Sequence, residues 1–275
     1  MNHDQQSKAD AFAALHAGPD IFIMPNPWDI GSTRVLAGLG FKALATTSVG
    51  YAFSKGYKDG VISRDEMLTH VAEIVAATDL PVSADLENGY GDSPEAAAET
   101  IRLAAATGLM GGSIEDYTPE GGGRFYDQAH ATERVAAAVE AARGGEVPFI
   151  LTARAENFIR GNPDLDDTIA RLQAFEAVGA DVLYGPGLPG LDAIRTVCQS
   201  VGKPVNLVMG LSGSQLTTAQ LAEAGVRRIS LGGSLARAAL GGLMDAAREI
   251  QTGGYSFLDR AAAGRDIAAH MRGAD

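Results

Sequence analysis

Short apolar runs rich in β-branched residues alternate with longer alanine-rich stretches along most of the chain. Each run is a few residues long and mostly apolar, as in a strand that is buried on both faces of a sheet. The pattern predicts strands at Ile21–Met24, Ala43–Thr47, Val82–Asp85, Gly112–Glu115, Phe149–Ala153, Val182–Tyr184, Val205–Val208 and Arg228–Leu231.

The stretches between these runs have the apolar spacing of amphipathic helices. Ser63 and Glu66 fit a capping box, and Ser93 precedes Pro94, so both places predict helix N-termini. Glycines that favour helix C-termini follow several stretches, at Gly40, Gly108, Gly179 and Gly225. The predicted helices are Arg64–Ala77, Pro94–Thr107, Ala131–Arg143, Asp166–Val178, Leu191–Val201 and Thr218–Ala224, with an extra helix at Ser256–Met271.

Strand–helix alternation at this spacing predicts βαβ units and a parallel sheet. Eight units predict a (β/α)8 TIM-type barrel, and 275 residues is near the roughly 250 typical of that fold. No long linker divides the chain, so we expect residues 1–275 to form a single domain. Residues 1 to about 10 are expected to be a polar tail. Residues from about 241 to 275 are expected to be a C-terminal helical extension that packs on the barrel or contacts another subunit.

The formal net charge of −12 argues against a nucleic-acid-binding protein, which needs clustered lysine and arginine. The single cysteine, Cys198, excludes an intramolecular disulfide and a cysteine-rich zinc site, and we expect it to be buried or partly buried. Residues 1–9 lack the apolar segment of a signal peptide, and no apolar run reaches the roughly 18 residues that cross a membrane. We therefore expect a cytoplasmic protein.

Polar residues follow most of the predicted strands. A parallel barrel has its active site at the carboxyl ends of its strands, so these residues are expected to meet at one mouth. They are Asn26, Asp29, Thr46–Ser48, Asp85, Glu87, Glu115, Asp116, Arg154, Glu156 and Asn206. Acidic residues that serve only solubility would be spread over the outer helices instead.

Asp85 and Glu87 are the most informative pair in this set. Alternation along a strand would send both side chains to the same side, where two carboxylates repel each other unless a cation or a proton lies between them. Hard oxygen ligands suit Mg²⁺, with Mn²⁺ as a substitute, and Mg²⁺ takes only one or two protein carboxylates. The alternative is that both residues cap or bridge loops, but Glu115 at the next strand end favours the metal.

Arg154 directly follows an apolar run, and its guanidinium suits a substrate carboxylate through two parallel hydrogen bonds. The alternative is a structural salt bridge to Glu115 or Glu156. The segment from Thr47 to Gly50 offers a hydroxyl and turn amides that could bind a carboxylate or an oxyanion.

In their order along the chain, these motifs resemble the isocitrate lyase/phosphoenolpyruvate mutase superfamily, in its 2-methylisocitrate lyase and oxaloacetate decarboxylase-like branch. The resemblance covers about Pro25 to Leu240. Each fragment is short, but the ordered set is specific. The fragments are Asn26-Pro-Trp-Asp29, Thr46-Thr-Ser-Val-Gly50 with Gly56 and Asp59, Ala84-Asp-Leu-Glu-Asn-Gly-Tyr-Gly91, Ser113-Ile-Glu-Asp116, Thr152-Ala-Arg-Ala-Glu156 and Pro204-Val-Asn206.

The resemblance implies a barrel whose last helix is often exchanged between neighbouring subunits, and a homo-oligomer that is commonly a tetramer, with a dimer as the alternative. It implies Mg²⁺ near Asp85 and Glu87, held largely through water, with Asp59 and Glu115 in the surrounding shell. The catalytic residues it implies are Arg154, Glu115 and Asp59. The substrate-binding residues are Thr47, Ser48, Val49, Gly50, Arg154 and Asn206.

The sequence departs from the family pattern in two places. Lyases of the family that split isocitrate-like acids carry a Lys-(Lys/Arg)-Cys-Gly-His loop, but residues 117–126 contain no cysteine, lysine or histidine, and they also lack the lysine and asparagine of the mutases. The metal motif reads Asp-x-Glu where Asp-x-Asp is commoner. Gly121–Gly123 still fits a mobile lid, which could carry Arg124, Tyr126 and His130 over the substrate. For His130 the favoured alternative is a solvated position at the start of a helix.

We therefore expect a Mg²⁺-dependent lyase that cleaves a C–C bond of a small 2-oxo or 2-hydroxy acid through a metal-stabilised enolate. Decarboxylation survives loss of the loop cysteine, because it needs an electron sink and little acid catalysis. Two alternatives stay open. One is hydrolysis or rearrangement of a phosphonate P–C bond, and the other is a non-catalytic barrel that binds a dicarboxylate.

Overall fold

The computed structural model describes residues 3–211 and 216–272. Within them, eight parallel strands form one sheet in the order β1-β10-β9-β8-β7-β4-β3-β2. The Ala45 amide on β2 donates to the Pro25 carbonyl beyond β1 at 3.0 Å, so the two edges of the sheet meet. The predicted (β/α)8 barrel is confirmed. Its strands are β1 (Phe22–Met24), β2 (Leu44–Ala45), β3 (Val82–Asp85), β4 (Gly111–Glu115), β7 (Ile150–Arg154), β8 (Val182–Tyr184), β9 (Val205–Val208) and β10 (Arg228–Ser230).

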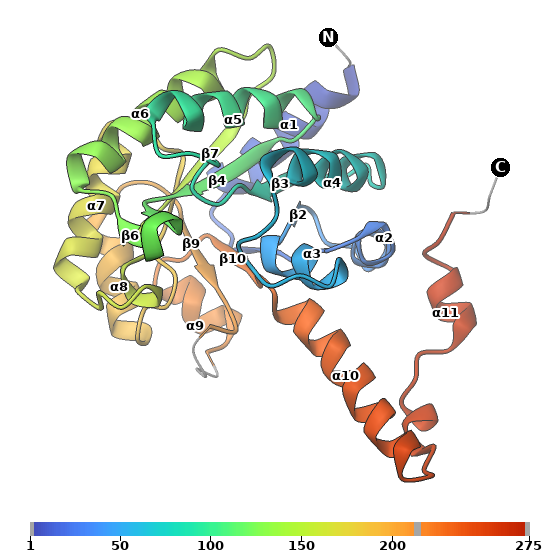
Figure 1. The fold of residues 1–275 in the computed structure, drawn as a ribbon. Coiled ribbons are helices and arrows are strands. Elements are labelled where there is room, and N and C mark those ends of the chain that lie inside the picture. Colours follow the sequence, from blue (N-terminus) through green and yellow to red (C-terminus); the bar gives the residue numbers. More distant parts are fainter. Residues whose placement is uncertain (1–2, 212–215, 273–275) are drawn as a thin grey trace.

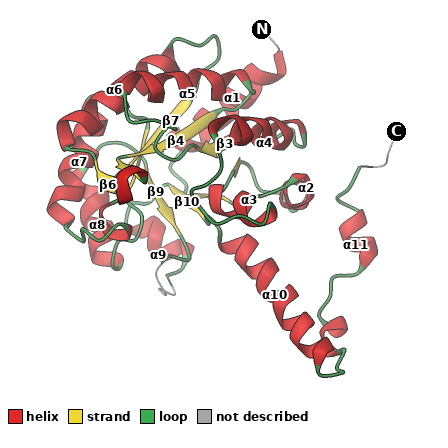
Figure 2. Cartoon of the chain, in the orientation of Figure 1, coloured by secondary structure: helices red, strands yellow, loops and turns green. Residues whose placement is uncertain are grey.

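Helices surround these strands (Figures 1 and 2). A short antiparallel hairpin of β5 (Tyr117–Thr118) and β6 (Arg124–Phe125) stands over the end of β4. The helices are α1 (His3–Ala17), α2 (Ile30–Gly38), α3 (Ser48–Ser54), α4 (Arg64–Ala76), α5 (Pro94–Ala106), α6 (Gln128–Arg143), α7 (Leu165–Ala177), α8 (Leu191–Ser200), α9 (Thr218–Glu223), α10 (Ser234–Gln251) and α11 (Gly264–Ala268).

The helix caps and helix-terminal glycines predicted from the sequence are present in the structure. The Ser63 side chain accepts the Glu66 amide, and the Glu66 carboxylate accepts the Ser63 amide, so the capping box at the start of α4 is complete. Ser93 caps α5. All four glycines predicted at helix ends have positive φ, from 89° at Gly40 to 103° at Gly179 and Gly225. The helix predicted from Ala131 begins earlier, at Gln128, because Asp127 caps it.

The N-terminal segment differs from the prediction of a polar tail. From His3 onward it is the first half of helix α1, which covers the amino end of the barrel. Phe12 is fully buried there and packs with Met24 and Met110 in a small apolar cluster. Ala9, within the predicted tail, is buried in the same cluster, so this segment packs against the barrel.

The C-terminal segment also differs from the prediction. The expected helix at Ser256–Met271 is absent; a short 3₁₀ turn at Ser256–Asp259 and the five-residue α11 occupy that region. The long helix is α10, which begins directly after β10 and projects away from the barrel (Figure 1). It exposes apolar side chains that include Leu243 and Met244. No helix in the described residues is long and apolar enough to cross a membrane.

Candidate active site

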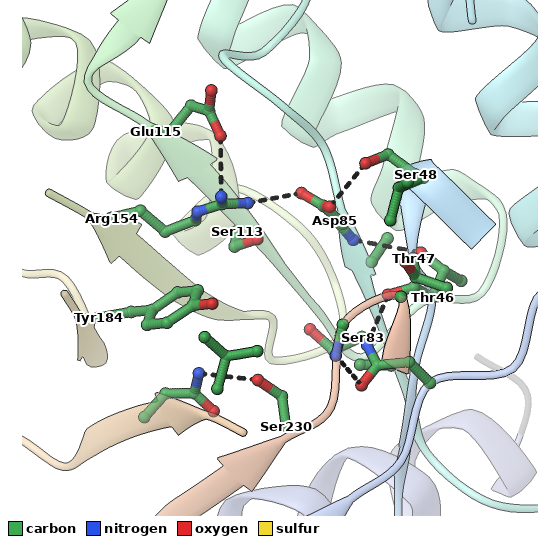
Figure 3. A pocket seen from close by; sticks show the side chains of 18 of the residues that line it. Thr46, Thr47, Ser48, Ser83, Asp85, Ser113, Glu115, Arg154, Tyr184 and Ser230 are labelled. Atoms are coloured by element: carbon green, nitrogen blue, oxygen red, sulfur yellow. Dashed lines mark hydrogen bonds and ion pairs between the residues drawn. The ribbon is translucent and has the colours of Figure 1, made fainter. Parts of the chain in front are cut away.

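A cavity of about 220 Å³ opens at the carboxyl ends of the strands (Figure 3). Neighbouring strands each contribute a side chain from their last residue: Asp85 from β3, Glu115 from β4, Arg154 from β7 and Tyr184 from β8. The parallel register aligns Glu115 with Arg154 and Arg154 with Tyr184, which places these groups at one level of the barrel. The predicted location of the site is the place where the cavity lies.

Arg154 is the centre of the polar network. Its Nη1 lies 2.8 Å from Asp85 Oδ1, and its Nη2 lies 3.0 Å from Glu115 Oε2 and 2.9 Å from Glu156 Oε1. The guanidinium also lies over the ring of Tyr184, 5.2 Å from its centroid. The salt bridges to Glu115 and Glu156 that the sequence left as an alternative are therefore present, together with a third to Asp85.

Asp85 connects Arg154 to the segment after β2. Its Oδ2 accepts a hydrogen bond from Ser48 Oγ at 2.9 Å, and its amide donates to Thr46 Oγ1 at 3.2 Å. Ser48 begins helix α3, and Thr47 is the residue that caps it. The predicted turn is thus the first turn of a helix, where unpaired amides favour a negative ligand.

Glu87 lines the cavity, but its side chain is not directed there by strand alternation as predicted. Strand β3 ends at Asp85, so strand alternation does not set the direction of Glu87. Its φ is 50°, a left-handed conformation that is uncommon for residues other than glycine, and Tyr90 has φ 56°. Burial raises the pKa of Glu87 to about 7, and the charges of Asp85 and Asp59 add to the effect. Strain and crowded charge at one residue are typical of a functional position.

Glu115 is buried at the far side of Arg154. Burial and the nearby Glu156 raise its pKa well above the ordinary value, against the opposing effect of Arg154. Its second oxygen points away from Arg154 (Figure 3) and lies 3.3 Å from Nη2 of Arg160. Asp59 is an exposed residue at the rim of the cavity. Its carboxyl group is partly shielded from water, and this shielding and the negative charge of Asp85 raise its pKa.

The floor of the cavity carries a second network, which is centred on Arg228. Asn206 accepts from Arg228 Nε at 2.8 Å and donates to Ser230 Oγ at 3.0 Å. Arg228 also donates to Thr152 Oγ1 at 2.9 Å, and its Nη1 lies 3.2 Å from His16 Nε2. Burial lowers the pKa of Arg228 to about 9. Both ends of the Asn206 amide are therefore already hydrogen-bonded, and Asn206 fixes the position of Arg228 at the bottom of the cavity.

The donor set fits a hard divalent cation. Asp85 and Glu87 supply carboxylate oxygens on one wall, and buried Glu115 Oε2 has an ion pair with Arg154 but no well-aligned hydrogen bond. No group of three or more His, Cys, Asp or Glu side chains in residues 3–211 and 216–272 is arranged to hold a metal directly. Mg²⁺ suits such a site, since it usually keeps several waters and takes one or two carboxylates.

Most of the predicted site residues line this cavity: Thr47, Ser48, Val49, Asp59, Asp85, Glu87, Glu115, Arg154 and Asn206. Gly50 does not, and its amide donates to Thr47 Oγ1 within α3. Asp116 turns away to pair with Arg171 at 3.0 Å behind the site. Ser83, Arg160, Tyr184 and Arg228 were missed. Tyr184 could have been found from its place at a strand end, whereas Arg160 follows a loop that has no such signal.

The proposed lid residues are held behind the cavity. Tyr126 is buried and donates to Asp92 Oδ1 at 2.8 Å, and Arg124 lies 2.8 Å from Asp92 Oδ2. His130 Nε2 lies 2.8 Å from the Asp92 carbonyl oxygen. In this conformation neither Arg124 nor Tyr126 lines the cavity. All three glycines of Gly121–Gly123 have positive φ, which explains their presence in the hairpin turn.

Comparison with known proteins agrees with this geometry. The phosphoenolpyruvate phosphomutase family model matches residues 12–251. An uncharacterised Mycobacterium tuberculosis protein, Rv1998c, is 31% identical over 88% of this chain and 90% of its own length. The oxaloacetate decarboxylase of Paraburkholderia xenovorans is 27% identical over 86% of this chain and 80% of its own length.

Solved structures extend the likeness to nearly the whole chain. A Burkholderia cenocepacia J2315 protein, provisionally named a lyase/mutase, is 56% identical with a TM-score of 0.95 over 97% of this chain and 96% of its own. The structure of 2,3-dimethylmalate lyase, titled a PEP mutase/isocitrate lyase superfamily member, is 25% identical with a TM-score of 0.83, over 98% of this chain and 95% of its own. The superfamily that the motifs indicated is confirmed.

Proposed function

The chain belongs to the phosphoenolpyruvate phosphomutase family, and from this membership we propose that it is a Mg²⁺-dependent carbon–carbon lyase. Its substrate would be a small 2-oxo or 2-hydroxy acid, cleaved by decarboxylation or by a retro-aldol step. The names oxaloacetate decarboxylase and 2,3-dimethylmalate lyase among its relatives support this class of reaction. Mn²⁺ is expected to substitute for Mg²⁺.

The contact that carries the proposal is Asp85 between Ser48 and Arg154. It joins a predicted metal ligand, a hydroxyl at a helix start and a fixed guanidinium in one cavity. Asp85 and Glu87 would hold Mg²⁺, with Asp59 and Glu115 nearby. When bound, the ion supplies a Lewis acid for the carboxylate and the 2-oxygen of the substrate.

The residues around the ion then bind and orient the substrate. Ser48 and the free amides at the start of α3 would bind the substrate carboxylate. Arg154 is held by three carboxylates, so its positive charge stays fixed near the 2-oxygen while the C–C bond breaks and negative charge develops there. Carbon dioxide can leave without a protein acid, which agrees with a hairpin that lacks cysteine, lysine and histidine.

Incubation with Mg²⁺ and three substrates tests the proposal. Oxaloacetate would give pyruvate and CO₂, 2-methylisocitrate pyruvate and succinate, and phosphonopyruvate pyruvate and phosphate. The second product identifies the bond that breaks. Because Mg²⁺ itself accelerates oxaloacetate decarboxylation, the rate is compared with that of Arg154→Ala at the same Mg²⁺ concentration. Phosphate release would instead support the alternative that the protein cleaves a phosphonate P–C bond. Tight binding of Mg²⁺ and oxalate without any turnover would instead favour a binding protein.

We also propose that the protein is a homo-oligomer in which the C-terminal helices are exchanged. Helix α10 leaves the barrel with Leu240, Leu243, Met244 and Ile250 exposed, which is unusual for a helix that stays in solvent. The family resemblance implies that a second copy of the chain packs against this face of α10. A dimer or a tetramer would satisfy this expectation.

A further inference from the structure

Arg160 is a second cation at the mouth of the cavity. It follows the 3₁₀ turn Asn157–Ile159, lines the cavity, and has 37% of its side chain exposed, against 11% for Arg154. Its Nη2 lies 3.3 Å from Glu115 Oε1 and its Nε 3.5 Å from Glu156 Oε2. The guanidinium is therefore close to the reaction centre and accessible to a ligand.

These contacts are looser than those of the arginines that hold the fold together. Buried Arg171 reaches Asp116, Asp167 and the Tyr126 carbonyl at 3.0 Å each. Arg160, by contrast, shares both of its carboxylate partners with Arg154, which holds them at 2.9–3.0 Å. Glu115 and Glu156 therefore remain paired when Arg160 turns toward a ligand.

Arg154 itself has little capacity left for a further anion. Its Nε and both terminal nitrogens already contact Glu156, Asp85 and Glu115. The Arg160 guanidinium lies 4.5 Å from the ring centroid of Tyr117, so the hairpin packs against it. Ile159 and Leu211 are apolar residues that also line the cavity.

We propose that Arg160 determines substrate specificity by binding a second anionic group, at the end of the substrate remote from Asp85. The preferred substrate is then a short 2-oxo or 2-hydroxy acid with a distal carboxylate or phosphonate, and a monoacid such as pyruvate binds poorly. This inference rests on the proposed function, since the first carboxylate must be bound on the Asp85 side. A guanidinium suits either distal group through paired hydrogen bonds.

Binding measurements with Arg160→Gln test the inference. Calorimetry with saturating Mg²⁺ compares oxalate, which has no distal group, with 3,3-difluorooxaloacetate and phosphonopyruvate, whose distal groups are a carboxylate and a phosphonate. The variant is expected to bind oxalate within about twofold of the wild-type protein and the longer ligands about tenfold or more weakly. Whichever longer ligand loses more affinity identifies the distal group. Arg160→Lys is expected to recover part of the loss.

Arg195→Gln is the matched control. Arg195 has the same side-chain exposure of 37% and one carboxylate partner, Asp192, but lies on α8 outside the cavity lining. Equal weakening of all three ligands by Arg160→Gln would overturn the inference, because Arg160 would then organise the whole site. Unchanged binding of all three would overturn it too. Failure of the wild-type protein to bind oxalate with Mg²⁺ would overturn the proposed function itself, and the inference with it.

Discussion

Arg154 Nη1 lies 2.8 Å from Asp85 Oδ1, although 69 residues separate the two in the chain. The pair joins β7 to β3 across β4, whose last residue Glu115 contacts the same guanidinium. Three buried or half-buried carboxylates therefore compete for one cation. A cluster of this kind is costly to desolvate, and it is retained where a ligand or a metal completes it.

Removal of the Asp85 carboxylate is expected to weaken metal binding. Asp85→Asn keeps the size of the side chain, but it loses the charge that attracts Mg²⁺. Calorimetry should show an affinity for Mg²⁺ at least about tenfold weaker than in the wild-type protein. Asp192→Asn removes a fully exposed carboxylate on α8 and serves as the control. Equal Mg²⁺ affinities for Asp85→Asn and the wild-type protein would contradict the metal site.

Substitution of Arg154 is expected to affect both stability and activity. Arg154→Ala leaves Glu115 and Glu156 buried without their main partner, which should lower the free energy of unfolding by about 3 kcal/mol. Arg154→Lys keeps a charge but cannot contact three carboxylates at once, so kcat should fall about a hundredfold with a smaller loss of stability. Urea unfolding and initial rates separate these effects. An active Arg154→Ala variant would rule out its catalytic role.

Substitution of the strained residue Glu87 is expected to change stability and Mg²⁺ binding in opposite directions. Glycine adopts φ near 50° without strain, and it also removes a carboxylate that repels Asp85. Glu87→Gly is therefore expected to raise the free energy of unfolding without metal by about 1 kcal/mol while it weakens Mg²⁺ binding. Urea unfolding with and without Mg²⁺ measures both changes. A variant that is less stable and binds Mg²⁺ normally would show that Glu87 has a structural role only.

Two buried histidines predict how stability depends on pH. Burial, with a smaller contribution from Arg228, lowers the pKa of His16 to about 3, and burial lowers that of His70 to about 4. The unfolded chain takes up these protons near pH 6.5, so the stability that the two neutral histidines contribute is fully present above that pH and is lost as pH falls toward 4 and 3. At pH 5 each histidine should cost about 2 kcal/mol of unfolding free energy.

Urea unfolding at pH 7 and pH 5 measures this dependence. His70 lies against Tyr51, with ring centroids 3.7 Å apart, so His70→Gln removes the titrating group together with a stacking contact. The variant is expected to be less stable at pH 7 and to lose less stability than the wild-type protein between pH 7 and pH 5. The same loss in both proteins would contradict a role for His70.

The exposed face of α10 is expected to lie in an interface between copies of the chain. Leu243→Asp, at a side chain that is 64% exposed, places a charge on this face without disturbing the barrel core. Light scattering should show a wild-type oligomer and a smaller species for the variant. A monomeric wild-type protein would contradict the proposed assembly. Asp245→Asn, on the same helix and also exposed, should leave the mass unchanged.

The sequence by itself determined the barrel, because the local spacing of apolar and polar residues is sufficient to predict the alternation of buried strands and capped helices. It also predicted where the cavity lies, since the carboxyl ends of parallel strands must meet. Tertiary structure alone decided which groups pair. The contact of Arg154 with three carboxylates depends on strand register, the direction of Glu87 depends on a left-handed turn, and Arg160 reaches the cavity from a loop. Local patterns do not encode these long-range contacts, and for the same reason α1 and α10 were not recognised as a packed cap and a projecting helix.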